Sequence, residues 1–221
     1  MSTVFMILYL ALLGLYLFVE TGDSFRRRAV NKILLSSLFL FFGQFWFWTC
    51  GYAHGWSYLA LIGLFYACMG DALLLFSFGA GGAAFAVANL CFSGYTFCML
   101  YFGGAFLKAL PWLGLGLLAF FVLFFRAMSS QWIDLGNTTG LALFYMFTVT
   151  LHGLMGLMTA ILLPDTHNLL LGIGLALFMV SDYFLVIYKY RSKQKRMLRC
   201  NTACYFLGMM LVALSFSVIS K

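Results

Sequence analysis

Long apolar runs fill most of this sequence and leave the chain few ways to fold. A helix that crosses a lipid bilayer needs about 20 mostly apolar residues, because its backbone polar groups must be bonded within the segment. Charged residues make up 9% of the 221 residues, against about 25% in a soluble domain. We therefore predict an all-α fold, with residues 1–221 forming one integral membrane domain, a polytopic bundle of eight transmembrane helices. The expected helices are Thr3–Val19, Val30–Thr49, Ser57–Phe78, Ala83–Phe102, Leu110–Phe125, Gly140–Leu163, Leu169–Tyr188 and Leu198–Ser220.

Glycine and proline separate several of these runs. Gly79–Gly82 is expected to form the turn between the third and fourth helices, since glycine permits a tight reversal of the chain. Pro111 is expected in the first turn of the fifth helix. Pro164 is expected to end the sixth helix, because it removes a backbone donor.

The placement of the basic residues predicts an orientation in the membrane. Eleven of the 13 Lys and Arg residues lie in or beside the loops that follow the first, fifth and seventh expected helices. With eight spans these loops share one side, which is the cytoplasmic side by the positive-inside rule. We therefore predict a multi-pass integral membrane protein with both termini non-cytoplasmic, in the cell membrane if the source is bacterial. Because topology accounts for the net charge of +7, we predict no nucleic-acid partner.

Two acidic residues lie inside apolar runs. Asp71 occupies the tenth position of Ile62–Phe76, and Asp182 occupies the tenth position of Ile173–Ile187. An ionisable residue at membrane depth costs about 2.5–3.5 kcal/mol on insertion scales, so each aspartate is a functional-site hypothesis. The four-helix offset between the segments is compatible with two parallel four-helix repeats. It would place both acids on helices of one direction, roughly 9–10 Å from the cytoplasmic end.

Two carboxyl groups that meet in a dry cleft do not readily both ionise, so we expect Asp71 and Asp182 to share one proton. Such a pair supplies a general acid beside a general base without a metal or another cofactor. The sequence does not decide which aspartate is the acid. A structural alternative is that each aspartate separately bonds a neighbouring helix. Motifs for a serine nucleophile, a zinc protease or a P-loop are absent, which leaves acid–base hydrolysis or proton-coupled transport.

Four further residues are candidates for contact with a substrate. His152 lies near the middle of the sixth run, where it is either a proton shuttle or a buried histidine bonded to a neighbouring helix. Lys32 is either a ligand for a phosphate headgroup or an anchor that reaches the membrane surface. Tyr183 and Tyr205 either extend their hydroxyl groups into the cleft or simply pack. We predict no metal site, since the cysteine and histidine spacings lack a full set of ligands.

Several segments together resemble the YhhN-type, lysoplasmalogenase-like family of small polytopic membrane proteins. They are GDALLL (Gly70–Leu75), SDYFLV (Ser181–Val186), ACYFLG (Ala203–Gly208) and the basic RRRAVNK (Arg26–Lys32). The resemblance covers nearly the whole length. It implies hydrolysis of the vinyl-ether bond of lysoplasmalogen, with release of a fatty aldehyde and a glycerophospho-ethanolamine or -choline. It also implies catalytic roles for Asp71 and Asp182.

The sequence therefore leads to one hypothesis and two rivals. The hypothesis is an intramembrane hydrolase whose Asp71 and Asp182 act on a lysophospholipid that enters from the bilayer. Protonation of a vinyl ether gives an oxocarbenium ion, so the chemistry parallels glycoside hydrolysis by two carboxyl groups. The first rival is a proton-coupled transporter of a lipid or small solute, because ionisable groups at equal depth in duplicated halves also describe a carrier. The second is a membrane scaffold in which the acids only tie helices together.

Overall fold

The apolar runs fold into helices throughout the part of the chain that the structure describes. A computed structural model describes residues 2–20, 24–50, 54–133 and 135–218, and these residues form α-helices and short 3-10 helices without a strand. The α-helices are α1 (Ser2–Val19), α2 (Phe25–Cys50), α3 (Tyr58–Leu73), α4 (Phe78–Phe102), α5 (Phe106–Ser129), α6 (Thr139–Leu162), α7 (Thr166–Tyr190) and α8 (Lys195–Ser215). The 3-10 helices are Gly55–Ser57, Gly136–Thr138 and Phe216–Val218.

Seven of these helices, α2 to α8, are long and apolar enough to cross a membrane. The remaining one, α1, is apolar but shorter than these seven segments, in which α3 is counted together with the 3-10 helix before it, as Gly55–Leu73. Large apolar side chains face outward along the bundle, as on α5, where Leu107 is 78% exposed and Leu123 is 65% exposed. Such a surface requires lipid around it. The protein is therefore a multi-pass membrane protein.

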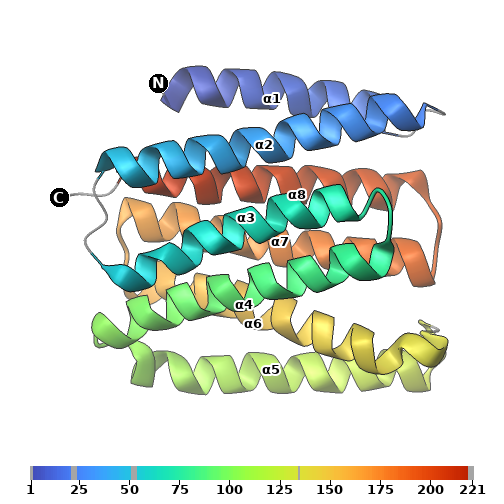
Figure 1. Ribbon diagram of the computed structural model, residues 1–221. Helices are drawn as coiled ribbons and strands as arrows, with labels where there is room; N and C mark the ends of the chain where they lie inside the picture. The colour runs from blue at the N-terminus through green and yellow to red at the C-terminus, as the bar shows by residue number, and fades with distance from the viewer. Residues whose placement is uncertain (1, 21–23, 51–53, 134, 219–221) are drawn as a thin grey trace.

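Successive helices run in opposite directions, so the loops alternate between the two ends of the bundle (Figure 1). The loops after α1, α3, α5 and α7 lie at one end, which carries most of the basic residues and is called the basic end below. Both termini lie at the other end (Figure 1). The helices α1 and α5 form the two outer edges of the view, whereas α3, α4, α7 and α8 lie between them. Consequently α3 and α7 run in the same direction, as the offset between the two acidic segments predicts.

The turn between α3 and α4 differs from the prediction. The segment Gly79–Gly82 does not form the turn but lies in the first turns of α4, which begins at Phe78. The reversal occurs earlier because Ser77 caps α4, its hydroxyl oxygen accepting a hydrogen bond from the Ala80 N–H at 3.3 Å. A side chain at Gly81 would meet Leu74 at 2.6 Å. These glycines therefore allow close packing of the hairpin rather than the reversal itself.

The start of α5 also differs from the prediction. The helix α5 begins at Phe106, so Pro111 lies inside it rather than in its first turn. Gly104 has a φ of +67° and completes the preceding reversal, which lets the helix start earlier than the proline. The end of α6 at Leu162, just before Pro164, agrees with the prediction. The predicted last span reaches Ser220, but residues 219–221 lie outside the described residues.

Candidate active site

Asp71 lies in the last turn of α3, with 1% of its surface exposed, and accepts three donors. The ammonium group of Lys32 is 3.1 Å from its Oδ1. The hydroxyl groups of Ser36 and Tyr205 donate to its Oδ2 at 2.5 Å and 2.7 Å. Because a nearby cation and hydrogen bonds to the charged form favour ionisation, these three side chains favour the carboxylate over the acid.

The three donors come from two helices that pack against each other. Lys32 and Ser36 are separated by four residues on α2, so they lie on the same face of that helix. Tyr205 comes from α8, and its ring makes edge contacts with Phe85 and Phe178, at centroid distances of 5.7 Å and 5.2 Å. The packing of α2, α3 and α8 therefore builds the charged site, while aromatic rings from α4 and α7 line its side.

The second acid has a different environment. Asp182 lies on α7 with 4% of its surface exposed. The hydroxyl group of Tyr145, from α6, donates to its Oδ2 at 2.7 Å. No ion pair to Asp182 is formed among the described residues. Each aspartate thus accepts a hydrogen bond from a phenol, but only Asp71 also has an ammonium group beside it.

The two carboxyl groups interact electrostatically, but within the described parts of the chain no hydrogen bond joins them. The two carboxyl groups are therefore not in direct contact, and the expectation that the pair holds one proton stays a prediction. The physical reason is that each carboxyl group is bonded to side chains of its own, Asp71 to Lys32, Ser36 and Tyr205 and Asp182 to Tyr145. The expected equal spacing from the helix ends also fails, because α3 ends at Leu73 whereas α7 continues to Tyr190.

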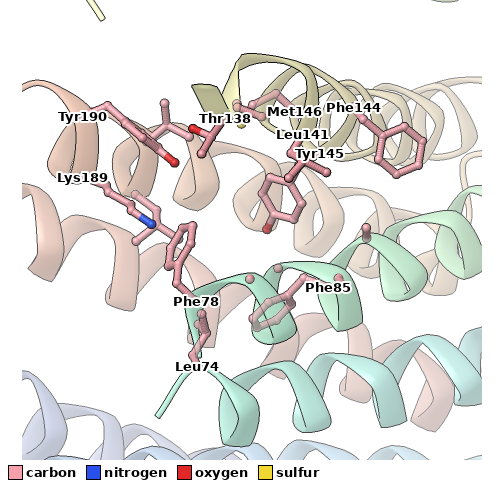
Figure 2. Close-up of a pocket in the computed structure, with 17 residues that line it drawn as sticks. Leu74, Phe78, Phe85, Thr138, Leu141, Phe144, Tyr145, Met146, Lys189 and Tyr190 are labelled. Carbon is pink, nitrogen blue, oxygen red and sulfur yellow. The ribbon is translucent and has the colours of Figure 1, made fainter. Parts of the chain in front are cut away.

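A cavity of about 470 Å³ opens between the basic ends of α4, α6 and α7, and neither Asp71 nor Asp182 is among its lining residues (Figure 2). Its polar lining consists of Thr138, Tyr145, Lys189 and Tyr190. Lys189 is exposed, and its ammonium group lies 2.8 Å from the ring centroid of Phe78. The apolar lining is formed by Leu74, Phe78, Gly79, Gly82, Ala83, Phe85, Ala86, Leu141, Ala142, Phe144, Met146, Leu185 and Val186. This lateral pocket therefore leads from the basic end to Tyr145, the partner of Asp182.

The other sequence-based candidates divide into two groups. Lys32 and Tyr205 both contact Asp71, as described above. His152 is fully buried, with its Nδ1 3.3 Å from the backbone oxygen of Thr148 and its ring 4.9 Å from that of Phe178. Tyr183 shares a hydrogen bond of 2.8 Å with Thr150. Neither His152 nor Tyr183 has a hydrogen bond to a carboxyl group among the described residues.

One family model matches most of the chain. The model of the YhhN family matches residues 27–216, a range that contains Lys32, Asp71, Tyr145, Asp182 and Tyr205. The chain belongs to the YhhN family. No curated protein and no solved structure matches it. The resemblance identified from the sequence segments is thus confirmed, and all of α1 lies outside the YhhN match.

Sequence reasoning missed two partners of the acids in this YhhN protein. Ser36 follows Lys32 by one helical turn, a spacing that could have identified it once Lys32 was chosen. Tyr145 had no such signal, because the chain has 12 tyrosines and only the packing of α6 on α7 selects this one. Among the described residues, no three His, Cys, Asp or Glu side chains form a group that could hold a metal ion.

Proposed function

We propose that this protein is an intramembrane hydrolase that cleaves the vinyl-ether bond of lysoplasmalogen-type lysophospholipids and releases a fatty aldehyde. The observation that supports this proposal most is the unequal pair of buried acids, one of which is bonded to Tyr145 in the lining of a lateral apolar pocket. Membership of the YhhN family supports the same reaction. The pocket volume of about 470 Å³ falls within the range of about 300–1,000 Å³ for small-molecule sites.

The donors around each acid assign the roles. Asp71 forms an ion pair with an ammonium group and accepts hydrogen bonds from two hydroxyl groups. It is therefore the carboxylate that supports positive charge and accepts a proton from water. Asp182, which has a phenol as its partner, is the general acid. An acid and a base with different environments can work at one pH because those environments separate their proton affinities.

The proposed reaction balances without a cofactor. The carboxyl group of Asp182 gives its proton to the vinyl carbon remote from the ether oxygen, and the double-bond electrons form the new C–H bond. The adjacent carbon becomes part of an oxocarbenium ion, which the Asp71 carboxylate stabilises. Water then attacks that carbon and passes a proton to Asp71. The C–O bond from the resulting hemiacetal carbon to the glycerol oxygen then breaks, and that oxygen takes the proton held by Asp71 and leaves as an alcohol. The hemiacetal hydroxyl gives its proton to Asp182 and becomes the aldehyde oxygen, which returns both acids to their starting states.

The lateral pocket would hold the substrate with its chain between α4 and α6. Lys189 lies at the basic end of this pocket, where its ammonium group would bind the phosphodiester as a point charge. Substitution Lys189→Gln is then expected to raise KM for the lysolipid and leave kcat nearly unchanged, which is the signature of uniform binding. An equal effect on kcat would place Lys189 in the chemical step instead.

The test uses purified protein and a lysoplasmalogen, with aldehyde release as the readout. Asp71→Asn and Asp182→Asn are each expected to lower kcat by at least about 100-fold, since general acid–base catalysis contributes about 10²–10⁴. The matched control is Asp165→Asn, which removes a carboxyl group that caps the same helix, α7, at its other end. A saturated alkyl-ether lysolipid should not react. Normal activity in both site variants would contradict the proposal.

A proton-coupled transporter is the alternative, and the buried Lys32–Asp71 ion pair is the observation that favours it. Ionisable pairs inside a membrane also form proton relays in carriers. Uptake of a lysolipid into proteoliposomes, driven by a pH gradient and without aldehyde release, would support the carrier and reject the hydrolase.

A further inference from the structure

A second cavity, of about 500 Å³, lies on the other side of α6. It is called the α5 cleft below, because the C-terminal part of α5 and the following loop form much of its lining. Ala142, Met146 and Val186 line both this cleft and the lateral pocket. The remaining lining residues are Phe120, Leu123, Phe124, Arg126, Ala127, Met128, Ser130, Trp132, Ile133, Leu135, Tyr183 and Ile187. One wall of side chains therefore separates two apolar cavities.

The α5 cleft lacks the groups that a reaction would need. No acidic residue is found among its described lining residues, and Asp134 lies outside the described residues. Its tyrosine, Tyr183, has its hydroxyl group bonded to Thr150 rather than to a carboxyl group. The cleft is thus a place for binding and not for the chemistry proposed above.

Two guanidinium groups lie at the basic end of the α5 cleft. Arg126 is in the last turn of α5, is exposed, and lines the cleft. Arg191 follows α7, and its guanidinium carbon lies 4.0 Å from the ring centroid of Trp132. Trp132 itself lines the cleft and is 40% exposed. A guanidinium group binds phosphate through two parallel hydrogen bonds, and a tryptophan ring is typical of the membrane interface.

We propose that the α5 cleft binds an anionic diacyl phospholipid, with one acyl chain among the apolar residues and the phosphate beside Arg126 and Arg191. The apolar lining matches a hydrocarbon chain, and the basic groups at one end match the headgroup. Two cations favour a lipid of net negative charge over a zwitterionic one, whose own ammonium group they would repel. This site does not depend on the proposed hydrolase function.

The test measures which lipid reaches Trp132. The protein is placed in nanodiscs that contain phosphatidylglycerol or phosphatidylcholine with brominated chains, which quench nearby tryptophan fluorescence. The signal of Trp132 is the difference between the wild type and Trp132→Phe. We expect stronger quenching by the anionic lipid. Arg126→Gln and Arg191→Gln should each reduce this preference by about fivefold, from about 1 kcal/mol per basic residue near the surface.

Lys108→Gln is the matched control, because Lys108 lies at the opposite end of α5, and it should leave the preference unchanged. Equal quenching by both lipids would overturn the proposal and mark the cleft as ordinary lipid-facing surface. So would displacement of the quencher by a lysophospholipid, which would assign the cleft to the substrate. If an arginine variant fails to fold, lipid retention by the wild type in native mass spectrometry still decides between the two lipids.

Discussion

At the scale of single residues, the ion pair between Lys32 and Asp71 requires an explanation, because a buried ion pair is weak evidence for stability. Removing charges from water costs several kcal/mol per ion, and an apolar replacement is often as stable. Asp71 is 1% exposed and the Lys32 side chain is 16% exposed. In the proposed hydrolase this pair, together with two further hydroxyl groups, would hold Asp71 as the carboxylate.

Single and double substitutions of Lys32 and Asp71 should give different results. Lys32→Met and Asp71→Asn should each lower the free energy of unfolding by about 3–5 kcal/mol, because each leaves one charge buried without its partner. The double variant removes both charges and should recover most of that stability while it remains inactive. Denaturant unfolding in detergent and aldehyde release are the two measurements. A double variant that is less stable than both single variants would contradict the argument.

Glu20 is a third buried acid, outside the spans, immediately after α1. It is 3% exposed, and the Thr202 hydroxyl donates a hydrogen bond to it. Burial raises the pKa of Glu20 from 4.5 to about 7, although Thr202 and the nearby basic groups of Lys32, Arg199 and Arg28 lower it in part. The folded protein therefore holds this proton more tightly than the unfolded chain does.

The sign of the resulting pH dependence follows from this pKa. A raised native pKa contributes stability that is fully present below about pH 4.5 and is lost as the pH rises through about 7. The wild type should lose on the order of 3 kcal/mol more than Glu20→Gln between pH 5 and pH 8. Thermal unfolding in detergent across this range checks it, with Asp165→Asn as the control. If the stability of the wild type and of Glu20→Gln changes equally with pH, the burial of Glu20 does not raise its pKa.

The sequence identified some of these residues and not others. Asp71 and Asp182 stand out because a carboxyl group inside an apolar run has no routine explanation. Lys32 was selected from its position beside a basic loop. Its ion pair with Asp71 was not predicted, because the pairing of α2 with α3 is a tertiary contact. Tyr145 could not be distinguished from other tyrosines, since its apolar ring is common in spans.

At the scale of helices, close approach of α7 and α8 depends on glycine. A side chain at Gly174 would lie 2.7 Å from the backbone oxygen of Gly208, and one at Gly208 would lie 2.6 Å from the oxygen of Gly174. Asp182 lies two turns beyond Gly174, and Tyr205 lies one turn before Gly208. Small residues at a helix crossing allow backbones to touch, so this contact sets the spacing of two site residues.

Gly174→Ala tests that role. The added methyl group meets backbone atoms that cannot rotate away, so we expect a loss of about 1–3 kcal/mol of stability from overpacking and a clear fall in activity. Gly114→Ala is the control, because Gly114 lies in α5 with nothing within 4 Å of the added group. That control should gain about 0.5–1 kcal/mol. If both variants unfold alike, the spacing of α7 and α8 does not depend on Gly174.

Helix positions followed from the sequence more closely than helix ends did. Length and apolar content locate α2 to α8, because the bilayer sets a minimum span. The ends depend on local contacts that composition does not record. The cap from Ser77 moved the start of α4 ahead of the glycines, and Gly104 moved the start of α5 ahead of Pro111.

At the scale of the whole molecule, a glycine–leucine contact between α2 and α3 has a counterpart between α6 and α7. Gly43 on α2 faces Leu64 on α3, and Gly156 on α6 faces Leu175 on α7. Leu64 precedes Asp71 by the same number of residues as Leu175 precedes Asp182. These matches support the proposal of two parallel four-helix repeats. From the sequence, only the two acidic segments could be aligned. The contacts of Leu64 with Gly43 and of Leu175 with Gly156 required the structure.

The proposed repeat would also relate the partners of the two acids. Lys32 precedes Gly43 by eleven residues, and Tyr145 precedes Gly156 by eleven residues. Each therefore occupies the same place on its helix and bonds the aspartate of the next helix. In a duplicated site, the change of this one position from a cation to a phenol would be enough to give the two acids different roles.

The number of spans and their orientation depend on whether α1 crosses the membrane. With 18 residues, α1 extends about 27 Å, close to the hydrocarbon thickness of about 30 Å, and it lies alongside α2 (Figure 1). If α1 spans, both termini lie outside and the basic end is cytoplasmic. Alkaline phosphatase fused to either terminus in a Gram-negative host should then be active, and inactive in the loop after α7. An inactive N-terminal fusion with an active C-terminal one would leave seven spans, with α1 on the cytoplasmic side.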